Sequence, residues 1–211
     1  MRIIDISMPI SEQMSVYKNK DEKRPKIETK QQANITETLL NLDAHTGTHI
    51  DAPLHIIPGG DTISRFHLEQ LICPCRILDF SKVSGGISRE DLITKEVVSG
   101  EFILLKTKNS FVEGFQFDFV YLKEDGAKYL AELPVMGVGI DALGIERDQP
   151  GHPTHKFLLE KSIPIIEGLR LKDAAWEGKY LLIAAPLSLV NTEAAPARVV
   201  LLETSYTEKF F

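Results

Sequence analysis

The chain is poor in cysteine and has no long apolar run. Its two cysteines among 211 residues, Cys73 and Cys75, flank a single proline. This spacing lacks the second cysteine pair that a structural zinc site needs and makes a poor disulfide framework, so we expect two reduced thiols. No apolar run approaches the length of a membrane span, and Asp5 interrupts the segment where a signal peptide would need its apolar stretch. These absences predict a cytoplasmic protein that has no membrane partner.

Basic residues are also outnumbered by acidic ones, 24 to 30. The formal net charge is −6 at pH 7, whereas a nucleic-acid or anionic-membrane partner requires a basic face. The lysines of residues 18–30 alternate with acidic side chains, which is typical of a solvated segment. The remaining composition is ordinary for a globular protein, and the length suits one domain over residues 1–211.

Hydrophobic patterning predicts a mixture of strands and helices. About seven to nine strands are expected, over residues 2–7, 36–43, 76–80, 102–106, 135–140, 163–166, 180–184 and 198–202. One short helix is expected after the N-cap Ser88, a second over residues 123–133 before Pro134, and a third from residues 155–160. Residues 11–32 are polar and are expected to be irregular. Strand–helix–strand alternation of this kind predicts an α/β domain.

Histidine, otherwise sparse, is concentrated in one run. Three of the six histidines and one aspartate lie in HTGTHIDAPLH, residues 45–55, at positions of one parity: His45, His49, Asp51 and His55. In an extended chain alternate side chains share a face, so these four groups would converge. A helix of about 100° per residue would turn Asp51 away from His45 and His49, and the glycine and proline in the run oppose helix.

Imidazole and carboxylate together suit a divalent cation such as zinc or manganese. The competing interpretation is a polar loop whose histidines satisfy backbone groups, which suits a lone histidine better than this cluster. The run therefore predicts a metal site.

The same run resembles the signature H-x-G-T-H-x-D-x-P-x-H of the cyclase-like metal-dependent hydrolases, the family of bacterial kynurenine formamidase and isatin hydrolase. Every fixed position is filled. A second block also fits, with Gly139-Ile140-Asp141, His155 and Glu167, and a weaker third block covers Ala195-Pro196-Ala197-Arg198. The resemblance extends from residue 3 to about residue 203 and implies a swivelling β/β/α domain, with a mixed, barrel-like central sheet flanked by helices.

The resemblance implies one or two metal ions per subunit. His45, His49 and Asp51 would bind the first ion, while Asp51, His155 and Glu167 would bind the second. Asp51 would bridge them, because a carboxylate has two oxygens and an imidazole has one free lone pair. Mixed nitrogen and oxygen ligands favour Zn²⁺, with Mn²⁺ as the alternative.

A general base is also expected. Bound metal lowers the pKa of water to about 7, and an uncoordinated histidine with a pKa of about 6.5 could exchange the proton. His55 is the candidate because it lies beyond Pro53, which is expected to turn the chain; the alternative is that His55 is a further metal ligand. His152 is an alternative to His155 as ligand.

Four other side chains have candidate roles near the site. Thr48 would orient a ligand or a water molecule rather than act as a nucleophile. Asp141 would support the metal ligands or cap a turn, and Arg198 would bind a substrate carboxylate or form a structural ion pair. His67 is expected to be structural or near the pocket wall.

One departure from the family concerns the N-terminal loop. Many relatives carry an aromatic-Pro-Gly-Asp turn that helps to frame the substrate, and here the stretch is Tyr17-Lys18-Asn19-Lys20-Asp21. The change bears on whether N-formylkynurenine is the substrate, not on metal-dependent hydrolysis.

Three functions remain open from the sequence. The favoured one is a hydrolase of a carbon–nitrogen bond in a small amide, formamide or lactam. The alternatives are a cyclase or lyase on the same scaffold, and a metal-binding protein without turnover. A homodimer or higher homo-oligomer is expected by resemblance.

Overall fold

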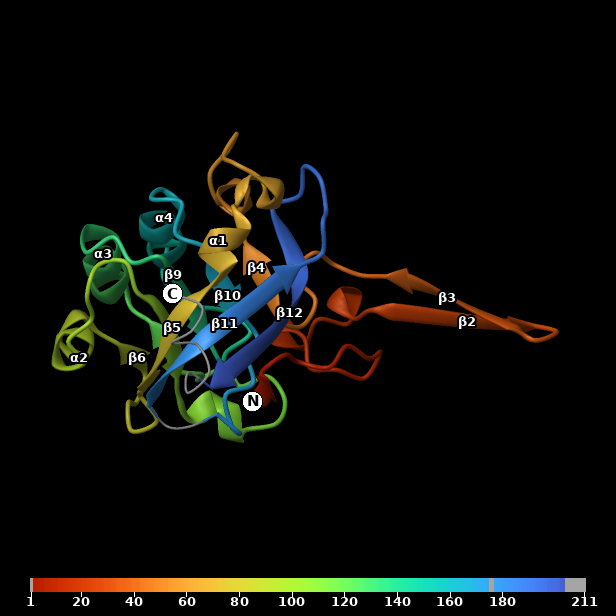
Figure 1. Ribbon diagram of the computed structural model, residues 1–211, viewed down its shortest axis with the longest axis horizontal. Helices are drawn as coiled ribbons and strands as arrows, with labels where there is room; N and C mark the ends of the chain where they lie inside the picture. Colours follow the sequence, from red (N-terminus) through yellow and green to blue (C-terminus); the bar gives the residue numbers. More distant parts are fainter. Residues whose placement is uncertain (1, 175–176, 204–211) are drawn as a thin grey trace.

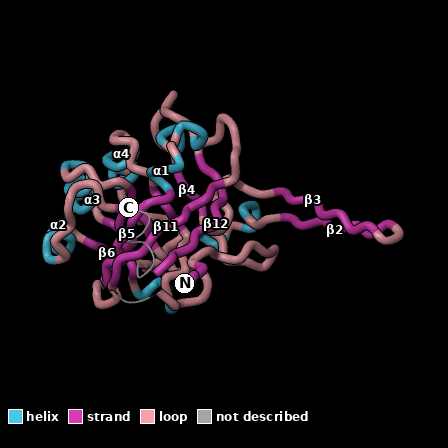
Figure 2. Tube along the Cα trace, in the orientation of Figure 1, coloured by secondary structure: helices cyan, strands magenta, loops and turns pink. Residues whose placement is uncertain are grey.

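The computed structural model describes residues 2–174 and 177–203. Its strands are β1 (Ile3–Asp5), β2 (Lys26–Gln32), β3 (Ile35–Asn41), β4 (His49–Asp51), β5 (Ile72–Asp79), β6 (Gly86–Ile87), β7 (Phe102–Lys106), β8 (Tyr121–Leu122), β9 (Gly137–Ile140), β10 (Ile165–Glu167), β11 (Gly178–Pro186) and β12 (Ala194–Glu203). Its α-helices are α1 (Leu68–Leu71), α2 (Arg89–Thr94), α3 (Glu124–Glu132) and α4 (Pro153–Leu159). Figures 1 and 2 show the central sheet with helices α2, α3 and α4 on one side and the long β2–β3 hairpin projecting from the other.

The central sheet closes on itself. Its strands pair in the order β12-β11-β5-β7-β9-β10-β4, and β4 pairs back onto β12. Strands β5, β7, β9 and β10 are parallel neighbours, whereas β4, β11 and β12 pair antiparallel. β1 and β4 pair with successive parts of β12. The expected mixed, barrel-like sheet flanked by helices is therefore confirmed.

Strand β7 shows how the sequence builds two cores. All five residues of this strand are buried, as expected for a parallel strand covered on both faces. Phe102 and Leu104 join the core inside the barrel, and Ile103 and Leu105 join the core beneath α2, α3 and α4. The period-2 alternation of a strand thus divides one apolar run between two layers. Each such fully buried side chain contributes about 1.5–3 kcal/mol to folding.

The neighbouring strand β9 is adapted to these large side chains. A Cβ at Gly137 would lie 2.1 Å from Phe102 Cε2, and a Cβ at Gly139 would lie 2.7 Å from Leu104 Cδ2. Glycine leaves the space that Phe102 and Leu104 fill. The alternation of glycine along β9 is therefore a packing requirement of β7.

The helix start at Ser88 is confirmed. The Ser88 side chain accepts a hydrogen bond from the Asp91 amide, while the Asp91 carboxylate accepts one from the Ser88 amide. Such a capping box satisfies amides that have no partner within the helix. Helix α3 falls within the expected residues 123–133, and α4 begins two residues before the expected start at residue 155.

The prediction that residues 11–32 are irregular is wrong over Lys26–Gln32. These residues form β2, which pairs residue by residue with β3. Almost all of the hairpin is exposed. The strand therefore has no alternation of apolar and polar residues from which it could be predicted. The two-residue strands β6 and β8 were also too short to predict.

Across the described ranges 2–174 and 177–203, none of the helices combines the length and the apolar character that crossing a membrane requires.

Candidate metal centre

The first histidine block is positioned by a tight turn and a short strand. Gly47 has φ +67°, and a Cβ at Gly168 would lie 2.5 Å from the Gly47 carbonyl oxygen. The Thr48 hydroxyl donates to the Gly168 carbonyl at 2.7 Å and accepts from the Met8 amide at 2.7 Å. Both functions of that hydroxyl are thus used by the backbone. Thr48 therefore ties this loop to Met8 and to Gly168, the residue after Glu167.

Strand pairing brings the first and second blocks together. β10 runs antiparallel to β4, with Glu167 opposite His49. Residues directly opposite in an antiparallel pair share a face. His49 Nε2 accordingly lies 3.4 Å from Glu167 Oε2 and 3.5 Å from Asp51 Oδ1. The expected approach of Glu167 to the strand carrying His49 and Asp51 is confirmed, although only His49–Asp51 of the histidine run is a strand.

Helix α4 supplies His155 from the other side. His155 Nε2 lies 3.4 Å from Glu167 Oε1 and 3.9 Å from Asp51 Oδ2. Glu167 Oε1 also accepts a hydrogen bond from the Ile145 amide at 2.6 Å. Glu167 is buried, so its carboxylate is directed at these histidines and not at the surface.

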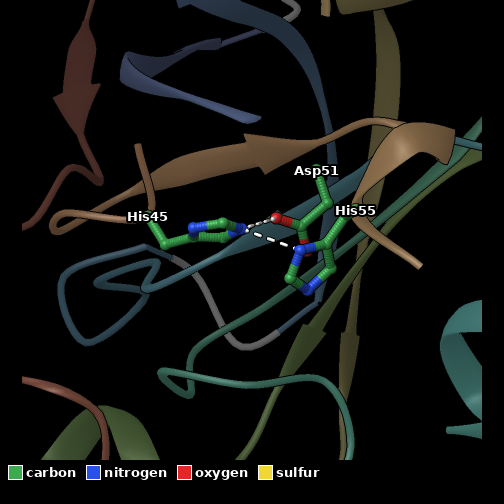
Figure 3. Close-up of side chains that lie close together, drawn as sticks. All are labelled: His45, Asp51 and His55. Carbon is green, nitrogen blue, oxygen red and sulfur yellow. Dashed lines mark hydrogen bonds and ion pairs between the residues drawn. The ribbon is translucent and has the colours of Figure 1, made fainter. Parts of the chain in front are cut away.

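His45 lies beside both Asp51 and His55, as Figure 3 shows. His45 Nε2 is 3.0 Å from His55 Nδ1 and 3.5 Å from Asp51 Oδ1. His55 ends a 3-10 turn, Pro53–His55, so the expected turn at Pro53 is confirmed. His45, Asp51 and His55 are close enough to hold a cation together. These distances therefore also suit a role for His55 as a metal ligand.

Several buried polar atoms in the cluster have no hydrogen-bond partner. They are His49 Nε2 and both carboxylate oxygens of Asp51, a residue with 0% exposure. An unpaired charge at such a position is costly, and buried polar groups in proteins nearly always have a partner. A divalent cation would satisfy all three atoms. The donor set of imidazole nitrogens and carboxylate oxygens fits zinc or manganese.

Electrostatics in the cluster follow from its buried carboxylates. Burial lowers the pKa of His49, but the nearby carboxylates of Glu167 and Asp51 outweigh burial and raise it to about 9. Burial likewise opposes the hydrogen bonds of His155 to Glu146 and Glu167, which raise the pKa of His155 to about 10. Burial would raise the pKa of Glu167, yet the nearby imidazoles of His155 and His49 hold it well below its ordinary value. The centre therefore attracts positive charge, whether protons or metal ions.

His55 behaves differently. Burial is the main cause that lowers its pKa, and the positive charges of His45 and His155 act in the same direction against Asp51. A neutral imidazole at neutral pH can accept a proton. The electrostatics of His55 thus suit a base.

Glu146 is a site residue that sequence reasoning missed. Its Oε2 accepts from the His155 amide and from His155 Nδ1, each at 3.1 Å, and its Oε1 lies 3.2 Å from His152 Nδ1. A carboxylate on the outer nitrogen of a histidine fixes the tautomer and leaves the inner nitrogen free for a metal. No spacing rule connects Glu146 to His155. The only sequence signal is that Glu146 is the first acidic residue after Asp141.

His152 does not replace His155. Its side chain is 62% exposed and contacts Glu146 rather than Asp51 or Glu167. Glu146, His152 and His155 nevertheless lie close enough to one another to hold a cation.

The other singled-out residues have structural contacts. Asp141 accepts hydrogen bonds from the amides and hydroxyls of Thr107 and Ser110, which fixes the turn after β7. Arg198 forms an ion pair with Asp5 at 2.6 Å. His67 is exposed at the N-terminus of α1. None of these three touches the cluster.

The two thiols are reduced, as expected, and buried in β5. Burial raises the pKa of Cys73 to about 11, and it raises the pKa of Cys75 further. Thiols of this kind are inert.

A cavity of about 680 Å³ opens onto the cluster. Its lining includes His45 and the buried His49, His155 and Glu167, and its exposed residues, among them Lys18, Asp148 and Pro150, form its mouth. A pocket of this volume holds a small organic molecule.

Together, the closed mixed sheet and the buried centre define an α/β barrel protein with a histidine–carboxylate site. The sequence profile of the family described as putative cyclase matches residues 4–147. A kynurenine formamidase from Salinibacter ruber (strain DSM 13855 / M31) is 31% identical over 207 residues, which cover 95% of this chain and 97% of that protein. The chain belongs to the putative cyclase family, and the resemblance carried by its motifs is confirmed.

Solved structures agree on the fold. A predicted metal-dependent hydrolase from Bacillus stearothermophilus superposes with a TM-score of 0.89 at 52% identity, covering 95% of this chain and 97% of that one. Isatin hydrolase A from Labrenzia aggregata, in complex with benzyl benzoate, superposes with a TM-score of 0.83 at 22% identity, covering 96% and 94%. At that identity the second similarity concerns the fold alone.

Proposed function

We propose that the protein is a metal-dependent hydrolase that cleaves a carbon–nitrogen bond in a small amide, formamide or lactam. The observation that carries the proposal is the set of buried, unpartnered ligand atoms on His49, which lines the cavity, and on the neighbouring Asp51. The similarity to kynurenine formamidases over nearly the whole chain supports the amide as substrate class.

The proposed ligands form two overlapping sets. His45, His49 and Asp51 bind one divalent cation. Asp51, His155 and Glu167 bind a second, so that Asp51 bridges. Each member of the sets has an atom within 3.9 Å of Asp51 or Glu167. Zn²⁺ is the proposed ion and Mn²⁺ the alternative, with one or two ions per chain.

His55 is the proposed general base. A divalent cation supplies polarisation of the carbonyl and a lower pKa for attacking water. His55 takes the proton of the water as its oxygen attacks the carbonyl carbon. It then returns that proton to the nitrogen as the carbon–nitrogen bond breaks, giving a carboxylic acid and an amine. Its lowered pKa keeps the imidazole neutral before the reaction.

The test is hydrolysis by protein of known metal content. Chelated protein is reloaded with Zn²⁺ or Mn²⁺ and supplied with formanilide, N-formylkynurenine and isatin. Release of formate or ring-opened product that needs the metal supports the hydrolase. Metal binding without turnover of any amide or lactam would favour a binding protein, and ring closure of an open substrate would favour a cyclase.

We also propose a homodimer of single-domain subunits, residues 1–211, in the cytoplasm. The β2–β3 hairpin supports the dimer, because it projects from the barrel (Figure 1) and exposes Ile35, Leu39 and Leu40 by 55–66%. An isolated two-stranded hairpin is only marginally stable in water. A second copy of the chain would cover it.

The dimer has its own test. Light scattering should give twice the chain mass for the wild type and a lower mass for Leu39→Lys. The matched control is Leu68→Lys on α1, which is also exposed but lies outside the hairpin. Equal masses for both variants would contradict the proposal that the hairpin lies in the dimer interface.

A further inference from the structure

The two carboxylate oxygens of Glu146 have different surroundings. Oε2 accepts hydrogen bonds from the amide and from Nδ1 of His155, each at 3.1 Å. Oε1 is buried in a side chain that is only 3% exposed, and none of residues 2–174 and 177–203 forms a hydrogen bond with it. A buried carboxylate oxygen without a partner is costly and rare. Oε1 is therefore an acceptor that a bound cation would satisfy.

His152 directs a second ligand atom at the same place. Its Nδ1 lies 3.2 Å from Glu146 Oε1, yet the two atoms are not aligned as a hydrogen bond. Zinc binds imidazole nitrogen and carboxylate oxygen at about 2.0–2.2 Å with tetrahedral geometry, so two such ligands of one ion lie roughly 3.4 Å apart. The observed separation is close to that value. Glu146 and His152 are therefore spaced as a pair of ligands to one ion.

The turn before α4 fixes His152 at the mouth of the cavity. His152 has φ 55° and ψ 51°, and Pro153 begins the helix directly after it. The His152 amide donates to the Gln149 carbonyl at 3.2 Å. Glu146 and His152 both line the cavity, and the His152 side chain is 62% exposed. An ion from solvent can therefore reach this pair without passing the buried cluster.

The pair is separate from the ligands of the two ions proposed above. His155 is near enough to Glu146 and His152 to share an ion with them. Its Nδ1 is held by Glu146 Oε2, however, and its Nε2 faces Asp51 and Glu167. Metal on both nitrogens of one imidazole would require loss of the ring N–H proton. The pair thus supplies two protein ligands, water supplies the others, and binding is weaker than at the buried centre.

We propose that Glu146 and His152 bind a further divalent cation at the mouth of the cavity, after the buried centre is filled. One carboxylate and one imidazole suit Zn²⁺. Each oxygen of Glu146 then has one task, because Oε2 holds His155 and Oε1 binds the ion. Binding of this ion does not depend on amide hydrolysis.

The experiment counts zinc that binds after the buried centre is full. Zn²⁺-loaded protein is freed of excess metal by gel filtration, its metal content is measured by mass spectrometry, and further Zn²⁺ is titrated by calorimetry. We expect one additional, weaker ion per chain in the wild type. His152→Gln should lose that ion and keep the metal that survives gel filtration. His67→Gln is the matched control, since His67 is also exposed but lies outside the cavity, and should keep the additional ion.

A second measurement locates the ion. Anomalous diffraction at the zinc edge, from crystals soaked in excess Zn²⁺, should show a peak between Glu146 and His152 that is separate from those of the buried centre. No additional ion in the wild type, or its retention in His152→Gln, would overturn the proposal. A lower metal content of His152→Gln after gel filtration would also overturn it, because His152 would then be a ligand of the buried centre. An additional ion on a protein that hydrolyses no amide would support this site and overturn only the hydrolase.

Discussion

The inner and outer halves of the centre are built differently. The inner half consists of His49, Asp51, His155 and Glu167, whose exposures range from 0 to 8%. Its members are held by the β4–β10 register and by helix α4. The outer half consists of His45, His55 and His152, which come from turns and helix ends and are partly or largely exposed.

This difference separates two tasks. Buried ligands placed by backbone pairing need little reorganisation when a cation binds, which favours affinity and geometry. A base must exchange its proton with reactants and solvent, which favours a half-exposed position on a turn. Apart from the ligand His45, the inner half should therefore control metal binding, and His55 of the outer half should control proton transfer. Each prediction below tests that division.

The largest effect is expected for Asp51→Asn. Loss of the shared carboxylate charge should remove most of the metal and lower hydrolysis by more than about 10⁴-fold, because both cations supply transition-state stabilisation. Mass spectrometry of the metal content measures it. Asp148→Asn, at the exposed mouth, is the matched control and should keep its metal. An unchanged metal content in Asp51→Asn would exclude the bridging role.

His55→Gln should separate the halves. We expect full metal content with turnover lowered by about 10²–10⁴-fold, the scale of a lost general base. His67→Gln provides a control outside the cavity. If metal content fell in parallel with activity, His55 would be a ligand and the division would fail.

Glu146→Gln should have a smaller effect, confined to the inner half. Without the carboxylate on Nδ1, His155 would lose its fixed tautomer, and affinity for one cation should fall about 10–100-fold. Titration with Zn²⁺ against a competing chelator measures this directly. His152→Gln, which leaves the Glu146–His155 contacts in place, should change affinity less. Equal effects of the two substitutions would contradict a specific role for Glu146.

The smallest effect concerns the stability of chelated protein against pH. The pKa values of His49 and His155 are raised to about 9 and about 10, so their contribution is complete below the unfolded value of about 6.5 and is lost as pH rises through the folded values. Glu167 has a lowered pKa, so its contribution is present above about 4.5 and is lost in acid. Stability from the cluster is therefore greatest between about pH 4.5 and 6.5.

Thermal melts at pH 6 and pH 8.5 test this. Added metal should raise Tm more at pH 8.5, because the metal-free cluster is weaker there and fewer protons must be displaced. A gain in Tm that is larger at pH 6 would contradict the assigned pKa directions.

Part of the site could be predicted because four of its residues are close in sequence. The one-parity run over residues 45–55 indicated His45, His49, Asp51 and His55 as neighbours, whereas His155 and Glu167 were joined to them through the family resemblance. Glu146 could not be predicted, since its contact with His155 depends on the loop between β9 and α4. Likewise β2 lacks a buried face, and the closure of β4 onto β12 is a long-range pairing that no local pattern encodes.

The central claim is that hydrolysis needs the metal held by the inner half. The most direct measurement is turnover of formanilide and N-formylkynurenine by protein stripped with a chelator, verified as metal-free by mass spectrometry, and then titrated with Zn²⁺. The account predicts no hydrolysis in the stripped protein and full recovery at one to two ions per chain. Undiminished hydrolysis by verified metal-free protein would contradict it.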